Sequence, residues 1–228
     1  MNSHKEMTRG LFITGTDTGV GKTVVACELL RNWAAQGWRA VGMKPVAAGI
    51  AAGAACNEDV AALAAAGNVE APLGLRNPFA FAPAIAPHLA AAEAGVPIDL
   101  ARIRTAYEVL AGRADRVAVE GAGGVFVPLD ARRDMLDIAL ALSLPVVLVI
   151  ALRLGCLNHA LLSAHAIRCR GAVFAGWVAN FVEPMLTRAD ANVAALEERL
   201  PAPRIATIAW AKADAPQWGP GAGALGLG

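Results

Sequence analysis

The segment Gly15-Thr16-Asp17-Thr18-Gly19-Val20-Gly21-Lys22-Thr23 carries the residue types that bind a nucleoside phosphate. The apolar run Leu11-Phe12-Ile13 precedes it, and a helix-like stretch from Lys22 to Ala35 follows. Backbone N–H groups in such a turn point inward, and the start of the helix adds partial positive charge. The Lys22 ammonium would reach the terminal phosphates of a nucleoside triphosphate, and the Thr23 hydroxyl would bind Mg²⁺. The segment therefore predicts a phosphate-binding loop between a strand and a helix.

The glycine spacing departs from the general pattern G-x-x-x-x-G-K-[ST], which expects glycine at position 16. Position 16 is Thr16, and the glycine stands one residue earlier, at Gly15. A glycine-rich strand-to-helix turn that binds nothing is the alternative. The intact Gly21-Lys22-Thr23, with a strand before it and a helix after it, favours phosphate binding.

Two acidic residues are candidates for Mg²⁺ ligands, because this ion prefers hard oxygen donors. Glu120 ends the apolar run Val117-Ala118-Val119 and precedes Gly121-Ala122-Gly123-Gly124. A carboxylate at the carboxyl end of a strand suits a metal beside phosphates, and a surface carboxylate at a turn is the alternative. Asp59 lies at the start of a predicted helix, where a stabilising N-terminal charge is an equally good interpretation.

Three further polar side chains follow predicted strands or lie in loops. Lys44 ends the second strand, where its ammonium would stabilise a transferring phosphoryl group or a bound carboxylate, although a surface lysine is equally compatible. Asn180 ends a later strand, and its amide matches the edge of adenine or serves a turn. His88 lies in a proline-rich, irregular segment, where ordering of the loop is the favoured role.

The segment Leu154-Gly155-Cys156-Leu157-Asn158 joins a strand to a helix. Free N–H groups at the start of that helix would bind an anion such as a substrate carboxylate. Asn158 also has the residue type of a helix cap, and the two roles are compatible.

Apolar strand-like runs alternate with helix-like runs along the chain. Strands are predicted at 11–14, 39–46, 116–120, 145–151, 173–179 and 204–208, and helices at 22–35, 58–66, 99–112, 134–142, 158–170 and 187–199. Several strands are apolar at consecutive positions, which indicates burial on both faces. The alternation predicts an α/β fold: a P-loop NTPase-like three-layer domain with a mainly parallel, doubly wound sheet. Gly37 and Gly171 are predicted to end helices, and Asp134, Asn158 and Thr187 to cap them.

The composition indicates a single domain over residues 1–228, with 1–9 and 216–228 poorly ordered and 47–57 a mobile loop. A hydrophobic fraction of 56% with 17% charged residues excludes general disorder. The net charge is +1 and no basic block is present, so nucleic acid is not favoured as a binding partner. The absence of a long apolar run or signal peptide indicates a cytoplasmic protein without membrane attachment. None of the four cysteines has C-x-x-C spacing, so reduced thiols are expected.

Taken together, these motifs resemble the dethiobiotin synthetase family. The resemblance is carried by the phosphate loop, Lys44-Pro45-Val46-Ala47, Pro87-His88, Glu120-Gly121-Ala122-Gly123-Gly124, Leu154-Gly155-Cys156-Leu157-Asn158-His159 and Gly176-Trp177-Val178-Ala179-Asn180. They occur in the family's order across roughly residues 10–210, and the early glycine is the family's own form. The resemblance implies ring closure of 7,8-diaminopelargonic acid (7,8-diaminononanoate) with CO₂ and ATP, through a carbamate and a carbamic–phosphoric anhydride, to dethiobiotin, ADP and phosphate.

The resemblance also implies a role for each matching position. ATP would be bound by Gly19, Val20, Gly21, Lys22, Thr23, Val24, Asp59, Glu120, Gly121, Ala122, Gly123, Asn180, Ala209, Trp210 and Ala211. Mg²⁺ would be held by Thr23, Asp59 and Glu120, and Lys22 and Lys44 would act in catalysis. The diamine substrate would lie against Thr18, Lys44, Ala48, Gly155 and Asn158, near the interface of a homodimer.

Three positions depart from the family pattern. Ala48 stands where a serine often contacts substrate, so a backbone N–H would have to replace its hydroxyl. Phe181 replaces a frequent aspartate and Ala209 a frequent proline near the base, which leaves the choice among ATP, CTP and GTP open.

Two alternative functions follow from the same loop. One is another ligase of the cobyrinic acid diamide synthase type, but this chain is too short to include the glutamine-hydrolysing domain of those enzymes. The other is a nucleotide-switched ATPase of the MinD/ParA type, which has a second lysine at the position occupied by Asp17.

Overall fold

The computed structural model describes residues 9–183, 187–210, 216–219 and 221–225. Its elements, in chain order, are β1 (Gly10–Gly15), α1 (Lys22–Ala35), β2 (Ala40–Met43), β3 (Val46–Ala48), α2 (Glu58–Ala66), α3 (Leu73–Arg76), β4 (Phe79–Phe81), α4 (Pro87–Ala94), α5 (Leu100–Arg113), β5 (Arg116–Gly124), α6 (Met135–Ala141), β6 (Val146–Ala151), α7 (Cys156–Cys169), β7 (Phe174–Asn180), α8 (Ala189–Arg199), β8 (Arg204–Ile208), β9 (Gln217–Trp218) and the short 3₁₀ helix η1 (Ala222–Leu225).

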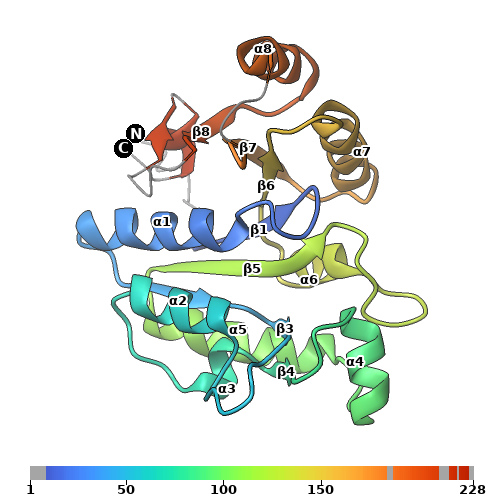
Figure 1. Ribbon diagram of the computed structural model, residues 1–228. Helices are drawn as coiled ribbons and strands as arrows, with labels where there is room; N and C mark the ends of the chain where they lie inside the picture. Colours follow the sequence, from blue (N-terminus) through green and yellow to red (C-terminus); the bar gives the residue numbers. More distant parts are fainter. Residues whose placement is uncertain (1–8, 184–186, 211–215, 220, 226–228) are drawn as a thin grey trace.

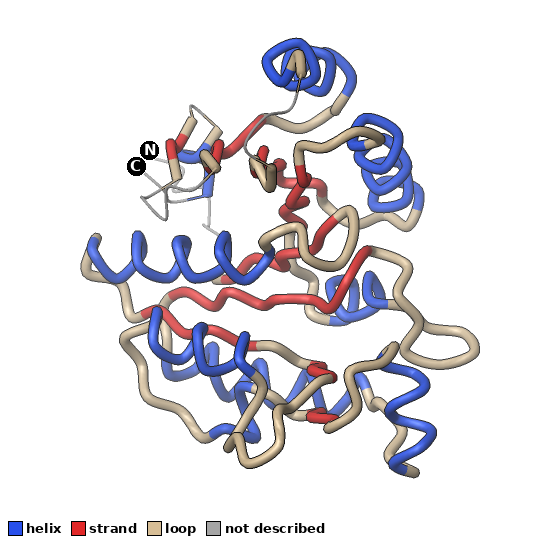
Figure 2. The backbone as a smooth tube through the Cα atoms, viewed as in Figure 1, coloured by secondary structure: helices blue, strands red, loops and turns tan. Residues whose placement is uncertain are grey.

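The main sheet has the strand order β2-β5-β1-β6-β7-β8-β9. Figure 1 labels β5, β1, β6, β7 and β8 of this sheet, and Figure 2 draws the strands in red in the same view. All neighbouring strands run parallel except β8 and β9, which are antiparallel. β1 lies between β5 and β6. β2 and β5 lie on one side of β1 and β6 to β9 on the other, so the loop after β1 is at a topological switch point of the sheet. Ligands of open α/β sheets bind at such a switch point, beyond the carboxyl ends of the strands.

The sheet is buried on both faces because its strands alternate between two apolar cores. In β1, Leu11 and Ile13 pack into one core and Phe12 into the other. Helices α1 and α2 supply side chains to the first core, and α5, α6 and α7 supply them to the second. Because both faces need apolar side chains, these strands are apolar at consecutive positions. The predicted three-layer α/β fold is confirmed.

One predicted strand is wrong in its extent. The run 39–46 is divided at Lys44 and Pro45: β2 ends at Met43 in the main sheet, and β3 begins at Val46 in a separate two-stranded sheet with β4. Proline has no N–H to donate to a ladder, so the chain leaves the main sheet there. The stretch 47–57, predicted to be a loop, therefore begins inside β3.

The proline-rich segment is more regular than predicted. It contains α3, β4 and α4, and His88 is the second residue of α4 rather than part of an irregular loop. Pro87 occupies the first turn of α4, where a missing N–H costs no helical hydrogen bond. The prolines that suggested irregular structure thus mark the boundaries of short elements.

Some helix ends lie where the residue types predicted them, and others do not. Gly37 and Gly171 follow α1 and α7 with positive φ, as predicted for helix stops. Asp134 caps α6, and with Asp137 it forms a reciprocal capping box. The caps predicted at Asn158 and Thr187 are wrong, because α7 begins earlier, after Gly155, and α8 begins after Arg188.

The described part of the C-terminal segment contains β9, which pairs with β8, and η1. Among the described residues, no helix combines the length and the apolar character needed to cross a bilayer.

We predict that Asp134→Ala lowers the free energy of unfolding by about 1–2 kcal/mol, because α6 loses its capping box. Arg170, whose guanidinium lies 2.8 Å from the Asp134 carboxylate, loses a partner as well. Asn158→Ala is the matched control, expected to change stability by less than about 0.5 kcal/mol because the residue is exposed and caps nothing. Urea unfolding followed by circular dichroism measures both, and equal losses would contradict the cap assignment.

Candidate active site

The phosphate-binding loop closes tightly over its own first residue. A Cβ atom on Gly15 would lie 2.5 Å from Val20 Cγ2 and 2.9 Å from the Asp17 carbonyl oxygen. Glycine is therefore required at position 15, which gives a physical reason for the early glycine of this loop. Gly19 and Gly21 have φ values of +73° and +90°, a region that L-residues with side chains rarely adopt.

The Lys22 ammonium is buried at the base of this loop. Its Nζ donates to the Asp17 carbonyl oxygen at 2.9 Å, so the loop folds around the cation. Burial, followed by the nearby charge of Lys44, lowers the pKa of Lys22 to about 8. Lys22 is still mainly protonated at pH 7, and a bound anion would stabilise its charged form.

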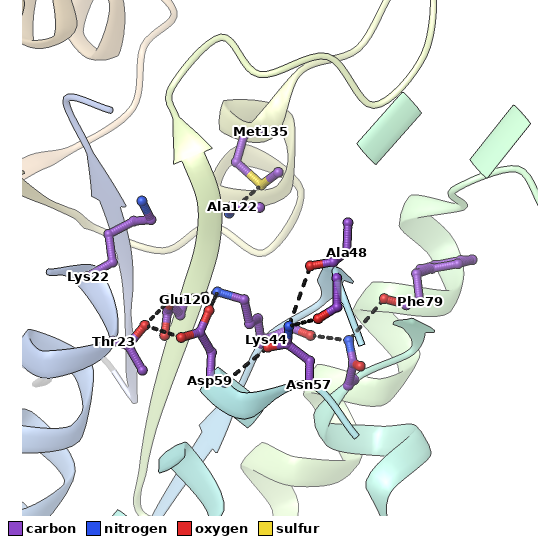
Figure 3. Close-up of polar contacts among 12 residues, drawn as sticks. Lys22, Thr23, Lys44, Ala48, Asn57, Asp59, Phe79, Glu120, Ala122 and Met135 are labelled. Carbon is purple, nitrogen blue, oxygen red and sulfur yellow. Dashed lines mark hydrogen bonds and ion pairs between the residues drawn. The ribbon is translucent and has the colours of Figure 1, made fainter. Parts of the chain in front are cut away.

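A second polar cluster joins α1, α2, β5 and the segment between β2 and β3 (Figure 3). Thr23 Oγ1 lies 2.8 Å from Asp59 Oδ1 and 3.0 Å from Glu120 Oε1. Lys44 Nζ lies 2.8 Å from Asp59 Oδ2 and 2.6 Å from Glu120 Oε1. The structure therefore brings together the three predicted metal ligands and Lys44, while the Lys22 ammonium points away from this cluster toward the phosphate loop (Figure 3).

Lys44 and Glu120 are almost completely buried, at 5% and 1% exposure. Burial alone would lower the pKa of Lys44, but the charges of Glu120 and Asp59 outweigh it and raise that pKa above its ordinary value. Burial likewise works against the charged form of Asp59, and Lys44 and Thr23 nevertheless hold its pKa below the ordinary value. Burial raises the pKa of Glu120 despite the attraction of Lys44. The interpretation of Lys44 as a surface lysine is excluded.

The cluster has more acceptor oxygens than donors. The Thr23 hydroxyl has one proton to share between two carboxylates, and Glu120 Oε2 is buried without a hydrogen-bond partner in the described part of the chain. Hydroxyl and carboxylate oxygens are the donors that Mg²⁺ prefers. The residues present therefore fit a divalent cation in addition to the Lys44 ammonium.

The glycines after Glu120 let β5 pass close to the phosphate loop. A Cβ atom on Gly123 would lie 2.7 Å from Val127 Cγ2 and 3.4 Å from Thr18 Oγ1. Gly121 packs against the Phe12 ring, and the Ala122 N–H donates to Met135 Sδ at 3.4 Å (Figure 3). Gly123 therefore lies next to Thr18, whereas Gly121 and Ala122 pack against Phe12 and Met135.

Asn180 contacts the phosphate loop rather than pointing freely into solvent. Its Nδ2 donates to the Val20 carbonyl oxygen at 2.8 Å, and a Cβ atom on Gly21 would lie 2.2 Å from that nitrogen. Ala209 and Trp210 follow β8, and the Trp210 side chain is half exposed. Ala211, the last residue predicted near the base, lies outside the described residues.

The loop before α7 carries an ion pair that the sequence did not indicate. Arg153 lies 2.7 Å from Asp17 Oδ2 and so joins this loop to the phosphate loop. Its only signal in the sequence was its position after a predicted strand. Gly155 caps α7 with a φ of +92°, and Asn158 is exposed in the first turn.

Two of the residues discussed from the sequence remain, Ala48 and His88. The Ala48 carbonyl is contacted by Asn57 Nδ2 at 3.4 Å, and the same nitrogen donates to the Gly49 carbonyl at 2.8 Å. Ala48 is thus held by its backbone beside α2. His88 Nδ1 is buried without a partner among the described residues.

Comparison with known proteins identifies the family of this chain. A family model described as an AAA domain matches residues 9–216. The ATP-dependent dethiobiotin synthetase BioD of Aromatoleum aromaticum is 50% identical over 202 residues, which cover 88% of this chain and 90% of that protein. The chain belongs to the dethiobiotin synthetase family. The enzymes of the same name from Nitrosospira multiformis and Pseudomonas paraeruginosa are 51% and 52% identical, covering 89% and 86% of this chain and 88% of each relative.

Solved structures support the fold of this dethiobiotin synthetase family member. The MinC:MinD cell division complex of Aquifex aeolicus matches with a TM-score of 0.56 at 15% identity, over 89% of this chain and 81% of that one. The signal recognition particle receptor FtsY of Elizabethkingia anophelis matches with a TM-score of 0.57 at 14% identity, over 98% and 65%. At these identities the likeness concerns the fold alone.

We predict that ATP binding weakens as the pH rises through about 8, because the free protein then loses the Lys22 charge. The dissociation constant of a non-hydrolysable ATP analogue, measured by calorimetry, should be constant up to about pH 7.5 and rise roughly tenfold per unit above pH 8. In Lys22→Arg the guanidinium stays protonated, so the rise should disappear. The same slope in both proteins would show that another group titrates.

Proposed function

We propose that this protein is an ATP-dependent dethiobiotin synthetase that converts 7,8-diaminononanoate and CO₂ to dethiobiotin. The observation that carries the proposal is a buried ammonium, Lys44, held between Asp59 and Glu120 beside a phosphate-binding loop. Relatives that share about half of their residues with this chain have that activity in their names.

The reaction needs a phosphorylation because a carbamate carbonyl is a poor electrophile. One substrate amine adds to CO₂ and loses a proton, which forms an N–C bond and a carbamate. A carbamate oxygen then displaces ADP from the terminal phosphorus of ATP and forms a carbamic–phosphoric anhydride. The second amine attacks the anhydride carbonyl, the ureido ring closes, and phosphate leaves with the electron pair of the broken C–O bond.

The two lysines would oppose the negative charge that gathers in this sequence. Carbamate and triphosphate are both anions, so bringing them together requires preorganised cations. Lys22 lies inside the phosphate loop, and Lys44 lies at the carboxyl edge of the sheet with a raised pKa. After burial, the charge of Lys44 is the next largest cause of the lowered pKa of Lys22, so the two ammonium groups lie near enough to repel each other.

Thr23, Asp59 and Glu120 would hold Mg²⁺ with ATP. The Thr23 hydroxyl lies within hydrogen-bond distance of both carboxylates, and one Glu120 oxygen has no partner in the described residues. When bound, the ion would neutralise phosphate charge during transfer. Lys44 would then exchange part of its contact with the carboxylates for contact with the carbamate.

The nucleotide and the diamine would lie on either side of this cluster. We assign ATP binding to Gly19, Val20, Gly21, Lys22, Thr23, Val24, Asp59, Glu120, Gly121, Ala122, Gly123, Asn180, Ala209, Trp210 and Ala211. Thr18, Lys44 and Ala48 would contact the reacting end of the diamine, and the exposed start of α7 at Gly155 and Asn158 would accept its carboxylate.

We further propose that the functional unit is a homodimer that uses the exposed side of α7. Leu154 before this helix is 95% exposed, and Leu162 within it is 61% exposed. Contiguous exposed apolar patches mark surfaces that bind another protein, and these two leucines would belong to such a patch. A second copy would cover them and would bring its own Gly155 loop close to the substrate.

The switch-ATPase alternative is less well supported. The residue at the position of the second switch lysine is Asp17, and its carboxylate is paired with Arg153. A carboxylate at this place would repel the phosphates that such a lysine attracts.

We predict that Lys44→Ala lowers kcat/KM by roughly 10²–10³, the cost of one preorganised charge. The assay contains diaminononanoate, bicarbonate, ATP and Mg²⁺ and follows the mass of dethiobiotin. The control is Arg39→Ala, which breaks the surface pair with Asp115 and should leave turnover unchanged. No product from the unmodified protein would refute the function, and full activity of Lys44→Ala would refute the role of this lysine.

We predict that Leu162→Glu dissociates the dimer, because burial of an unpaired carboxylate at the interface is unfavourable. Sedimentation equilibrium of the unmodified protein should give twice the mass of the 23.4 kDa chain, and that of the variant should give the chain mass. Leu89→Glu, which changes an exposed leucine on α4, should remain dimeric. A dimeric Leu162→Glu variant would place the interface elsewhere.

A further inference from the structure

Lys44 lies at a place where the main sheet no longer holds the backbone. The last β2 residue paired with β5 is Met43, opposite Val119. β3 begins at Val46 and pairs with β4 in the other sheet. The backbone of Lys44 and Pro45 therefore passes between two sheets, although its side chain must reach the carboxylates with high precision.

The turn from α3 to β4 supplies the missing contacts. The Lys44 N–H donates to the Arg76 carbonyl at 2.8 Å, and the Phe79 N–H donates to the Pro45 carbonyl at 3.1 Å. The Lys44 carbonyl accepts a hydrogen bond from Asn77 Nδ2 at 2.8 Å. Both backbone groups of Lys44 are thus bound by consecutive residues of one short turn.

Asn77 is the one side chain among these contacts. Its amide is buried, at 5% exposure, and its Nδ2 also donates to the Phe79 carbonyl at 3.0 Å. The amide nitrogen therefore binds two carbonyl groups, that of Lys44, directly after β2, and that of Phe79, in β4. Its Oδ1 is buried without a partner in the described residues. A buried amide that leaves one atom unsatisfied is costly for stability alone, which points to a role for the bonds that its nitrogen makes.

We propose that Asn77 is a positioning residue for Lys44. Its amide fixes the Lys44 carbonyl and so sets the direction in which the lysine side chain leaves the backbone. Without it, Lys44 would keep its charge and its carboxylates, but its ammonium would no longer be held at one place against the reacting anions. The proposal rests on the proposed function, because it concerns the lysine that acts in that reaction.

Asn68, at the opposite end of β2 from Lys44, offers a control variant. Asn68 Oδ1 accepts from the Ala40 N–H at 2.7 Å, and its Nδ2 donates to the Trp38 carbonyl at 2.9 Å. Asn68 therefore fastens β2 by the same kind of bond, at the end remote from Lys44. Asn68→Ala tests the effect of loosening β2 without loosening the lysine.

The deciding experiment is a double-mutant cycle on product formation with Lys44→Ala and Asn77→Ala. In the unmodified protein, Asn77→Ala should lower kcat roughly 10- to 100-fold, as expected for a reacting group misplaced by about 1 Å, with the KM for ATP within about twofold. In the Lys44→Ala protein the same change should cost less than about twofold, because no lysine remains to be positioned. Asn68→Ala should keep kcat within about threefold.

An equal fold-loss of kcat from Asn77→Ala in both backgrounds, or an equal loss from Asn68→Ala, would overturn the proposal. If Asn77→Ala does not fold, Asn77→Leu keeps the branched shape and the number of side-chain heavy atoms and removes the unpartnered Oδ1, and the same cycle is measured with it. These outcomes are distinct from failure of the proposed function, which would appear as no dethiobiotin from the unmodified protein.

Discussion

The ion cluster around Lys44 is the constraint on which the rest of the site depends. An ammonium and a carboxylate removed from water are stable only when each has a partner and good geometry. Lys44 and Glu120 meet this condition together, with Asp59 as a half-buried third member. Removing one partner from such a cluster typically costs about 3–5 kcal/mol, so its members cannot drift apart without loss of stability. The charges that suit the chemistry are therefore also a condition of the fold.

The order of strands brings the cluster together. β5 lies between β2 and β1, and its register places Glu120 opposite Ile13 and Val119 opposite Met43. Lys44 follows Met43 directly, so it emerges beside Glu120. Helix α1 continues from the phosphate loop and carries Thr23 to the same edge. Parallel pairing thus converts distant positions in the sequence into neighbours at one end of the sheet.

The surroundings of the two lysines of the site shift their pKa values in opposite directions. Lys22 is buried among backbone groups, and its pKa is lowered to about 8. Lys44 is buried among carboxylates, and its pKa is raised. One cation can therefore gain charge stabilisation from an incoming polyphosphate, while the other is charged before any ligand arrives. The same residue type serves two purposes because the charge of Lys44 adds to the effect of burial at Lys22, whereas the carboxylates outweigh burial at Lys44.

The sequence by itself determined the phosphate loop, the alternation of strands and helices, and the candidate ligands Thr23, Asp59 and Glu120, since these depend on local spacing and on apolar runs. It could not distinguish Lys44 from a surface lysine, nor Asp59 from a helix-terminal charge, because burial and partners are properties of packing. It also missed Arg153 and Asn77, and it misplaced the cap of α7. Only the tertiary structure decided these points, because they depend on strand order, on register and on a turn about thirty residues away that closes on the backbone of Lys44.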